Sequence, residues 1–294
     1  LGVNVTIDTF HDTITGTALV ERLQPYDIIC MMRERTPIDA ALMDKLPNLR
    51  GIVTSGMRNA ALDIDAAKSR GLMVSGTGSP GHATSELAFT LIAMQARQIF
   101  ASATAMRDGG WQTHLGRDLR GARLGILGLG RLGAQLAGYA KAFGMEIQAW
   151  SQNLTEERCD EVGVSYVDRD TLFRSSDFIS IHLKLSARVR QLVGAEEIAM
   201  MKPDAYLVNT SRAPIIDMEA LTNALVKRQI AGAAIDVYDH EPVPPTDPIR
   251  NAQNLLMTPH IGYVTRETMD IFYGETLDAV EAMIAGTPIR ELMP

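Results

Sequence analysis

Cysteine and aromatic residues are scarce in this chain. Its 294 residues include two cysteines, Cys30 and Cys159, and 5% aromatic side chains. Two cysteines cannot form the disulfide framework of a small secreted domain, so we interpret both as free thiols in a reducing compartment. This interpretation predicts a cytoplasmic protein.

The chain also lacks a basic run and a long apolar run. Its formal net charge is -7, and no segment carries enough successive positive charges to neutralise several phosphates. The most apolar stretch, "ELAFTLIAMQARQIFASATAM", is interrupted by Gln95, Arg97 and Gln98, whereas a membrane span needs about 20 apolar residues. We therefore expect neither nucleic acid nor a membrane as a partner.

Short apolar runs alternate with segments of helical periodicity along the chain. With 46% hydrophobic residues, the chain is long enough for two domains, each with its own core. The alternation predicts parallel sheets joined by right-handed crossovers. The predicted strands of a first sheet are 26–32, 50–56 and 72–78, with helices at 38–49 and 62–71. Those of a second sheet are 122–130, 146–151, 178–183, 205–211, 232–238 and 254–260.

Two longer helical segments flank the second series of strands. The first is predicted from Glu86 to about Arg107, where Gly109 and Gly110 would end it. The second covers 266–286 and has no strand after it. A closing helix of this kind could return to the first sheet, which would make that domain discontinuous in sequence.

The segment "GLGRLG", residues 128–133, follows the apolar strand "LGIL" and opens the helix "AQLAGYAKAF". In this context Gly128 permits a tight turn, Gly130 lets backbone amides approach a pyrophosphate, and Gly133 lets the helix pack on the strand. Glycine patterns also occur in simple helix-packing turns, but the strand and helix on either side favour a dinucleotide site. Arg131 could add positive charge near the phosphates or lie in solvent.

A carboxylate that would hold the ribose of NAD is missing. It is expected about 20 residues after the glycines. Ser151 stands there instead, and the next acids, Glu156 and Glu157, lie past the strand end. No cation for the 2′-phosphate of NADP occurs in this segment before Arg158. The sequence therefore leaves the choice between NAD and NADP open, and slightly favours an enzyme that tolerates NADP.

Three ionisable residues follow successive apolar runs: Arg212 after "AYLVNTS", Glu241 after "GAAIDVYDH", and His260 after "NLLMTP". Taken singly, each has an ordinary interpretation as an anion partner in a loop, a surface acid or a turn histidine. Ligands of open parallel sheets, however, collect at the carboxyl ends of the strands. Together the three supply a guanidinium clamp for a keto acid, a proton donor for its carbonyl oxygen, and a carboxylate that orients the donor.

At this point the chain resembles a known family. "GLGRLG", "HLKLSARVRQLVG", "MKPDAYLVNTSRAPIID", "AAIDVYDHEP" and "LLMTPHIG" occur in the order and spacing of the D-isomer-specific 2-hydroxyacid dehydrogenases. With "NAALDIDAAKSRG", the resemblance covers nearly the whole chain. It implies reversible NAD(P)H-dependent reduction of a small 2-keto acid to a D-2-hydroxy acid, as in glyoxylate or hydroxypyruvate reductases and phosphoglycerate dehydrogenases.

The resemblance also implies residue roles. Arg212, Glu241 and His260 would be catalytic, and no metal is expected. His182 would lie along the cofactor cleft and Asp236 near the nicotinamide amide, although His182 can equally be a strand-end histidine packed in the sheet. The residues that the resemblance and the glycine pattern assign to cofactor binding are Gly128, Gly130, Arg131, Leu132, Gly133, Ser151, His182, Thr210 and Asp236.

The expected substrate loop departs from the family pattern. Relatives offer backbone amides to the substrate carboxylate here, which points to Met57, Arg58 and Asn59 as substrate-binding residues together with Arg212. Arg58 stands where the family usually has glycine. We hypothesise that Arg58 adds a cation that favours substrates with a second polar or anionic group, and the alternative is an arginine turned to solvent or to another loop.

The resemblance implies two Rossmann-like α/β domains across a cleft. They are a flavodoxin-like substrate domain at 1–95 and 267–294, and an NAD(P)-binding domain at 96–266. A homodimer through the cofactor domain is expected, with Trp111 as an aromatic anchor unless it is a core residue. The chain begins without methionine and without the family's strand and helix before "VNVTI". It ends too early for the regulatory domain of some relatives, which favours the plain reductase type.

Two other functions remain as alternatives. A corepressor-like protein that senses nicotinamide nucleotides would use the same fold to bind a protein partner. A formate-dehydrogenase-like enzyme would use the same cofactor loop, but formate oxidation does not need the proton transfer that Glu241 beside His260 provides.

Overall fold

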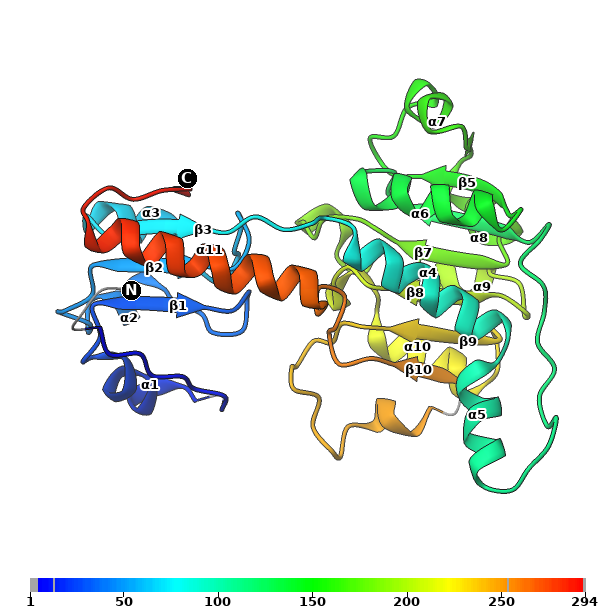
Figure 1. Ribbon diagram of the computed structural model, residues 1–294. Coiled ribbons are helices and arrows are strands. Elements are labelled where there is room, and N and C mark those ends of the chain that lie inside the picture. The colour runs from blue at the N-terminus through cyan, green and yellow to red at the C-terminus, as the bar shows by residue number, and fades with distance from the viewer. Residues whose placement is uncertain (1–4, 13, 253, 293–294) are drawn as a thin grey trace. The chain divides into compact units, whose positions relative to one another are not determined.

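The computed structural model describes residues 5–12, 14–252 and 254–292 and is shown in Figure 1. Its contacts divide the chain into two compact units, Leu1–Pro80 with Thr265–Pro294 (unit 1) and Gly81–Val264 (unit 2). Each unit contains a parallel sheet, which confirms the predicted α/β class. Among the described residues, no helix is both long enough and apolar enough to span a membrane.

Unit 1 is built on a parallel sheet with the order β1-β2-β3. The two connecting helices start where the sequence places a capping carboxylate: the side chains of Asp39 and Asp63 accept hydrogen bonds from the N–H groups of Leu42 and Ala66. Its elements before the second unit are α1 (Gly16–Leu23), β1 (Ile28–Met31), α2 (Ala40–Met43), β2 (Gly51–Thr54), α3 (Ile64–Ser69) and β3 (Met73–Gly76).

The closing helix α11 (Arg266–Ile284) belongs to unit 1. It packs against β2 and β3. Ala279, Val280 and Met283 of the helix form a buried apolar cluster with Val53 of β2. Unit 1 is therefore assembled from the two ends of the chain.

Unit 2 contains a parallel sheet with the order β10-β9-β8-β7-β4-β5-β6. The chain runs outward from β4 through β5 to β6 and then crosses back to β7, on the other side of β4. This reversal creates a crevice beyond the carboxyl ends of β4 and β7, where ligands bind in sheets of this kind. The strands are β4 (Arg123–Leu127), β5 (Glu146–Trp150), β6 (Ser165–Tyr166), β7 (Phe178–Ile181), β8 (Tyr206–Asn209), β9 (Gly232–Ile235) and β10 (Leu255–Met257).

Helices cover both faces of the unit 2 sheet (Figure 1). The helices α4 and α6 pack in one apolar cluster, and α8, α9 and α10 pack in the other. Burial on both faces explains why the central strands are nearly continuous apolar runs. The helical elements are α4 (Ala83–Ala96), α5 (Ile99–Arg107), α6 (Arg131–Ala142), α7 (Glu156–Val162), α8 (Arg169–Ser175), α9 (Ala195–Met200), α10 (Met218–Val226), η1 (Ala187–Val189), η2 (Ala213–Ile215) and η3 (Pro248–Asn251).

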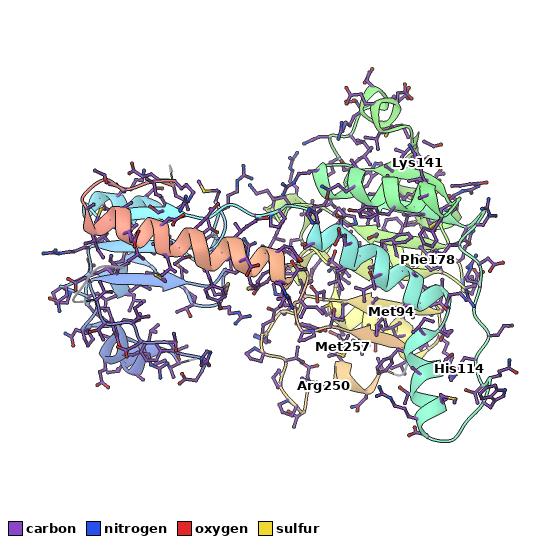
Figure 2. All side chains as sticks on the ribbon, in the orientation of Figure 1. Met94, His114, Lys141, Phe178, Arg250 and Met257 are labelled. Atoms are coloured by element: carbon purple, nitrogen blue, oxygen red, sulfur yellow. The ribbon has the colours of Figure 1, made fainter. Side chains whose placement is uncertain are left out.

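The single helix predicted from Glu86 to Arg107 is wrong in one respect, because two helices, α4 and α5, occupy this segment. Gln98 separates them with a left-handed φ of 51°. Its amide donates a hydrogen bond of 2.8 Å to the Tyr206 hydroxyl. Tyr206 in turn stacks on the buried Phe178, whose place in the sheet is marked in Figure 2.

The division between the units comes earlier in the chain than the predicted boundary near residue 95. Helix α4 packs against α6, β8 and β9 and therefore belongs entirely to unit 2. The sequence does not reveal this assignment, because periodicity shows that a helix is apolar but not which sheet it covers.

Candidate active site

The glycine loop follows β4 at the point where the strand order reverses. Gly128 has a φ of +101°, and a Cβ atom there would lie 2.8 Å from the carbonyl oxygen of His182 on the neighbouring chain segment. A Cβ atom on Gly133 would overlap the carbonyl oxygen of Gly128. Gly130, in contrast, has no atom within 4 Å of a Cβ position. The first and third glycines thus permit close packing, and the second leaves space at the N-terminus of α6 for an anion.

The two predicted cofactor residues between Gly130 and Gly133 differ in exposure. Arg131 is exposed and Leu132 is half-buried. The Arg131 guanidinium lies against Gly81, where an added Cβ atom would overlap it. This position, beside the segment that precedes α4, keeps Arg131 at the edge of the loop.

Two buried polar atoms lie after the ends of β7 and β8. His182 Nε2 lies 2.8 Å from the Ser180 hydroxyl. His182 Nδ1 and Thr210 Oγ1 are buried without a hydrogen-bond partner in the described part of the chain. An unsatisfied buried polar group is costly and calls for an explanation, and a polar ligand group would supply the missing partner. These atoms, with the open space at Gly130, fit a dinucleotide.

Burial lowers the pKa of His182 to about 4 from 6.5, so the folded protein holds this imidazole neutral. Between these pH values the unfolded chain binds a proton that the folded chain does not. The contribution of His182 to the free energy of unfolding should therefore be fully present above pH 6.5. It should decrease as the pH falls toward 4, by up to about 1.4 kcal/mol per pH unit. The His182→Gln variant is expected to flatten this dependence in denaturant titrations.

The exposed His114 provides the matched control, since His114→Gln also removes one histidine. An unchanged pH slope in the His182→Gln protein would contradict the buried neutral imidazole.

Asp236 follows β9 and holds the turn that carries His260. The residue is 1% exposed, and its carboxylate accepts hydrogen bonds from the Thr258 hydroxyl at 2.6 Å and from the N–H groups of Ile261 and Gly262 at 2.8 Å each. Burial raises the pKa of Asp236, and these bonds oppose the rise. His260 has a left-handed φ of 54°. The structure therefore shows Asp236 fixing a strained turn at the predicted site.

His260 and Glu241 form the closest ionisable pair of the site. His260 Nδ1 lies 2.6 Å from Glu241 Oε2, and Glu241 Oε1 accepts a hydrogen bond of 2.9 Å from the N–H of Tyr238. Burial acts to raise the pKa of Glu241, but the bonds with His260 and Tyr238 and the charges of His260 and Arg212 outweigh it and lower the pKa. Glu241 therefore stays ionised and fixes Nδ1 of the imidazole.

Arg212 lies between β8 and η2, within electrostatic range of Glu241. The buried Asn209 shapes this turn: its amide group donates to the Arg212 carbonyl at 3.0 Å, and its side-chain oxygen accepts from the N–H of Ser211 at 2.9 Å. The guanidinium donates a hydrogen bond of 2.8 Å to the Ser211 carbonyl. Unit 2 thus brings the three predicted catalytic residues together.

The predicted substrate loop lies in unit 1, and its three residues differ in exposure. Met57 and Arg58 are exposed, and Arg58 forms no hydrogen bond or ion pair with the residues that the structure describes. Asn59 is buried, and its amide nitrogen donates to the Arg33 carbonyl at 2.8 Å and to the Thr54 hydroxyl at 2.7 Å. The Asn59 side chain therefore stabilises the loop itself.

A cavity of about 250 Å³ lies beyond the carboxyl ends of β5 and β7. Ser151 lines it, as do Trp150 and Gln152. Lys184 and Arg188 line it too, and the sequence analysis missed both. The residue spacing from the glycine loop points only to the loop after β5, whereas Lys184 and Arg188 follow β7. Their position in "HLKLSARVRQLVG", after a strand end, was the available signal.

Comparison with known proteins identifies the family. The NAD-binding domain of the D-isomer-specific 2-hydroxyacid dehydrogenases matches residues 89–262. The glyoxylate reductase of Korarchaeum cryptofilum is 36% identical over 85% of this chain and 77% of its own length. The chain belongs to the D-isomer-specific 2-hydroxyacid dehydrogenase family.

Other members of this family show the same relationship. The D-3-phosphoglycerate dehydrogenase of Archaeoglobus fulgidus is 33% identical over 92% of this chain and 52% of its own length. The crystal structure of a phosphoglycerate oxidoreductase from Vibrio cholerae has a TM-score of 0.89 and 32% identity, covering 94% of this chain and 90% of that one. Family membership supports an NAD-dependent 2-hydroxyacid dehydrogenase activity, with residues 89–262 as the NAD-binding domain.

Proposed function

We propose that this dehydrogenase reversibly reduces a small 2-keto acid to a D-2-hydroxy acid with NADH or NADPH. The observation that carries the proposal is the 2.6 Å contact between His260 and Glu241 within electrostatic range of Arg212. All three residues follow strands of the sheet that also carries the glycine loop. We propose unit 2 as the dinucleotide domain and unit 1 as the substrate domain.

The three side chains divide the chemistry between them. Arg212 would bind the substrate carboxylate through a forked pair of hydrogen bonds and polarise the keto oxygen. His260 would give the proton on Nε2 to that oxygen, and in the reverse direction it would take the proton back. Glu241 would fix the orientation of the His260 ring, while Asp236 holds the turn. The nicotinamide cofactor supplies the hydride when bound.

The cofactor would be held by residues around the reversal of strand order. The amides after Gly128 and Gly130, at the start of α6, suit the pyrophosphate, with Arg131 and Leu132 at its edge and Gly133 packed beneath. Ser151 in the cavity after β5 suits the adenosine ribose. His182 Nδ1 and Thr210 Oγ1 suit polar groups farther along the molecule.

Substrate choice would depend on the loop of unit 1 as well as on Arg212. Glyoxylate and hydroxypyruvate are the proposed substrate type. Exposed Met57 and Arg58, with the backbone at Asn59, are the proposed contacts. If Arg58 selects substrates with a second polar group, the Arg58→Ala variant will raise KM more for such keto acids than for glyoxylate.

The test of the proposed function is oxidation of NADH and, separately, of NADPH with glyoxylate, hydroxypyruvate, pyruvate and phenylpyruvate. Turnover with at least one keto acid is expected. Cofactor binding without turnover, together with capture of a stoichiometric protein partner, would favour the corepressor-like alternative. Reduction of the oxidised cofactor by formate alone would favour a formate dehydrogenase.

We further propose that a second copy of the chain covers the apolar surface on α5 and the segment after it. Trp111 is 73% exposed and Leu115 95% exposed, so Trp111 is not a core residue of unit 2. Ile99, Phe100 and Met106 of α5 are exposed as well. Several large exposed apolar side chains on one helix and the segment that follows it are typical of an interface.

The Trp111→Ala variant is expected to weaken this homodimer by about 30-fold or more, because buried tryptophan anchors contribute about 2 kcal/mol or more. Light scattering over a concentration series measures the shift from dimer to monomer. Val226→Ala is the control, since Val226 is 72% exposed on α10. A wild-type protein that is monomeric throughout, or a Trp111→Ala dimer of undiminished affinity, would disprove the proposal.

A further inference from the structure

We propose that Lys184 and Arg188 bind the 2′-phosphate of NADP, so that the enzyme prefers NADPH to NADH. The inference rests on the proposed function, because it specifies which nicotinamide cofactor the same site takes.

The cavity has the charge that a phosphate requires. Its volume is about 250 Å³, and its lining includes two cations, Lys184 and Arg188, and no carboxylate. Ser151, at the end of β5, contributes a neutral hydroxyl. A carboxylate at this position would hold the two ribose hydroxyls of NAD and repel a phosphate. The adenosine end of the crevice is therefore open to a dianion.

The two cations are not engaged by the protein residues that the structure describes. Within residues 5–12, 14–252 and 254–292, neither the Lys184 ammonium nor the Arg188 guanidinium forms an ion pair or a hydrogen bond. Arg158, the first cation after β5, is engaged differently: it lies 2.9 Å from Glu161 and also donates to the Leu129 carbonyl. Lys184 and Arg188 are thus the cations that remain for a ligand in this cavity.

A hydrogen bond connects the segment that carries the two cations with the loop after β5. The Gln152 amide, in the loop after β5, donates a hydrogen bond of 3.2 Å to the carbonyl of Arg188 in η1. This bond brings the loop after β7 against the loop after β5. A guanidinium forms forked hydrogen bonds with phosphate oxygens, and an ammonium adds a compact charge. Together the two cations suit a phosphate on the ribose at Ser151.

Calorimetric titration of the full-length protein with adenosine 2′,5′-bisphosphate and with AMP tests this assignment without turnover. The bisphosphate is expected to bind at least 10-fold more tightly than AMP. In the Lys184→Ala/Arg188→Ala double variant this ratio should fall to about 1, with AMP affinity unchanged. The control is Arg190→Ala, which removes an exposed cation of the same segment that does not line the cavity.

The outcomes separate this inference from the proposed function. Equal affinity of wild type for the bisphosphate and AMP would overturn the 2′-phosphate assignment, while keto-acid reduction with NADH would leave the proposed function intact. Equally tight binding of adenosine 3′,5′-bisphosphate would also overturn the assignment, because NADP carries its phosphate on the 2′-oxygen. Failure to bind any adenine nucleotide would overturn both. A preference for the 2′-phosphate that disappears only in the double variant would support the inference.

Discussion

Replacing His260 with glutamine is expected to lower kcat for keto-acid reduction by about 10²- to 10⁴-fold, the usual contribution of a positioned acid or base. Glutamine keeps a polar side chain but cannot deliver a proton from Nε2 while Glu241 holds Nδ1 at 2.6 Å. The effect should appear in the rate of a single turnover. Cofactor affinity, measured by calorimetry, should remain unchanged, because the glycine loop and the cavity after β5 lie apart from this pair.

The neighbouring His240 offers a control within the same segment. It is exposed, so His240→Gln should leave kcat within about 2-fold of wild type, as surface substitutions normally have small effects. If both histidine variants lost activity equally, or if His260→Gln kept full activity, His260 would not be the proton donor.

Replacing Arg212 with glutamine should lower kcat/KM by about 10²- to 10⁴-fold. Each charge-assisted hydrogen bond to the substrate carboxylate is worth about 1.5–3 kcal/mol, and the forked pair supplies two of them. KM should rise because the carboxylate loses its partner, and kcat should fall because the keto oxygen loses its polarising charge. Steady-state kinetics with glyoxylate at saturating cofactor would separate these two effects.

The Arg212→Lys variant is the matched control for charge. It keeps the positive charge near Glu241 but loses the planar fork, so its activity should lie between those of wild type and Arg212→Gln. Equal activity of the lysine and glutamine variants would show that fork geometry, and not charge, carries the effect. Wild-type kinetics in both would remove Arg212 from the mechanism.

The strands were predictable from the sequence because burial on both faces of a parallel sheet leaves an unbroken apolar run. The break between α4 and α5 was not predictable in the same way. It occurs at Gln98, an ordinary helix residue, and the hydrogen bond that accompanies it goes to Tyr206, far away in the sequence. Periodicity reports which face of a helix is apolar, but it carries no information on distant partners.

The same distinction applies to the site. The sequence singled out Arg212, Glu241 and His260 because their chemistry is complementary and each follows a strand. It did not predict that Asp236 holds the His260 turn through Thr258, Ile261 and Gly262. It also missed Lys184 and Arg188. These residues follow β7, whereas Ser151 follows β5, and the two loops line one cavity because β5 and β7 flank β4 in the sheet.

The chain order of the two units has a consequence for synthesis. A ribosome makes residues 1–80 before unit 2, yet it makes the helix that covers β2 and β3 after unit 2. Until α11 has emerged, Val53 lacks the apolar side chains of Ala279, Val280 and Met283. Unit 2, in contrast, is continuous in sequence and has all of its strands before residue 258. Residues 1–80 therefore leave the ribosome before unit 2 but complete their fold after it, so their sheet lacks the cover of α11 while the whole of unit 2 is translated.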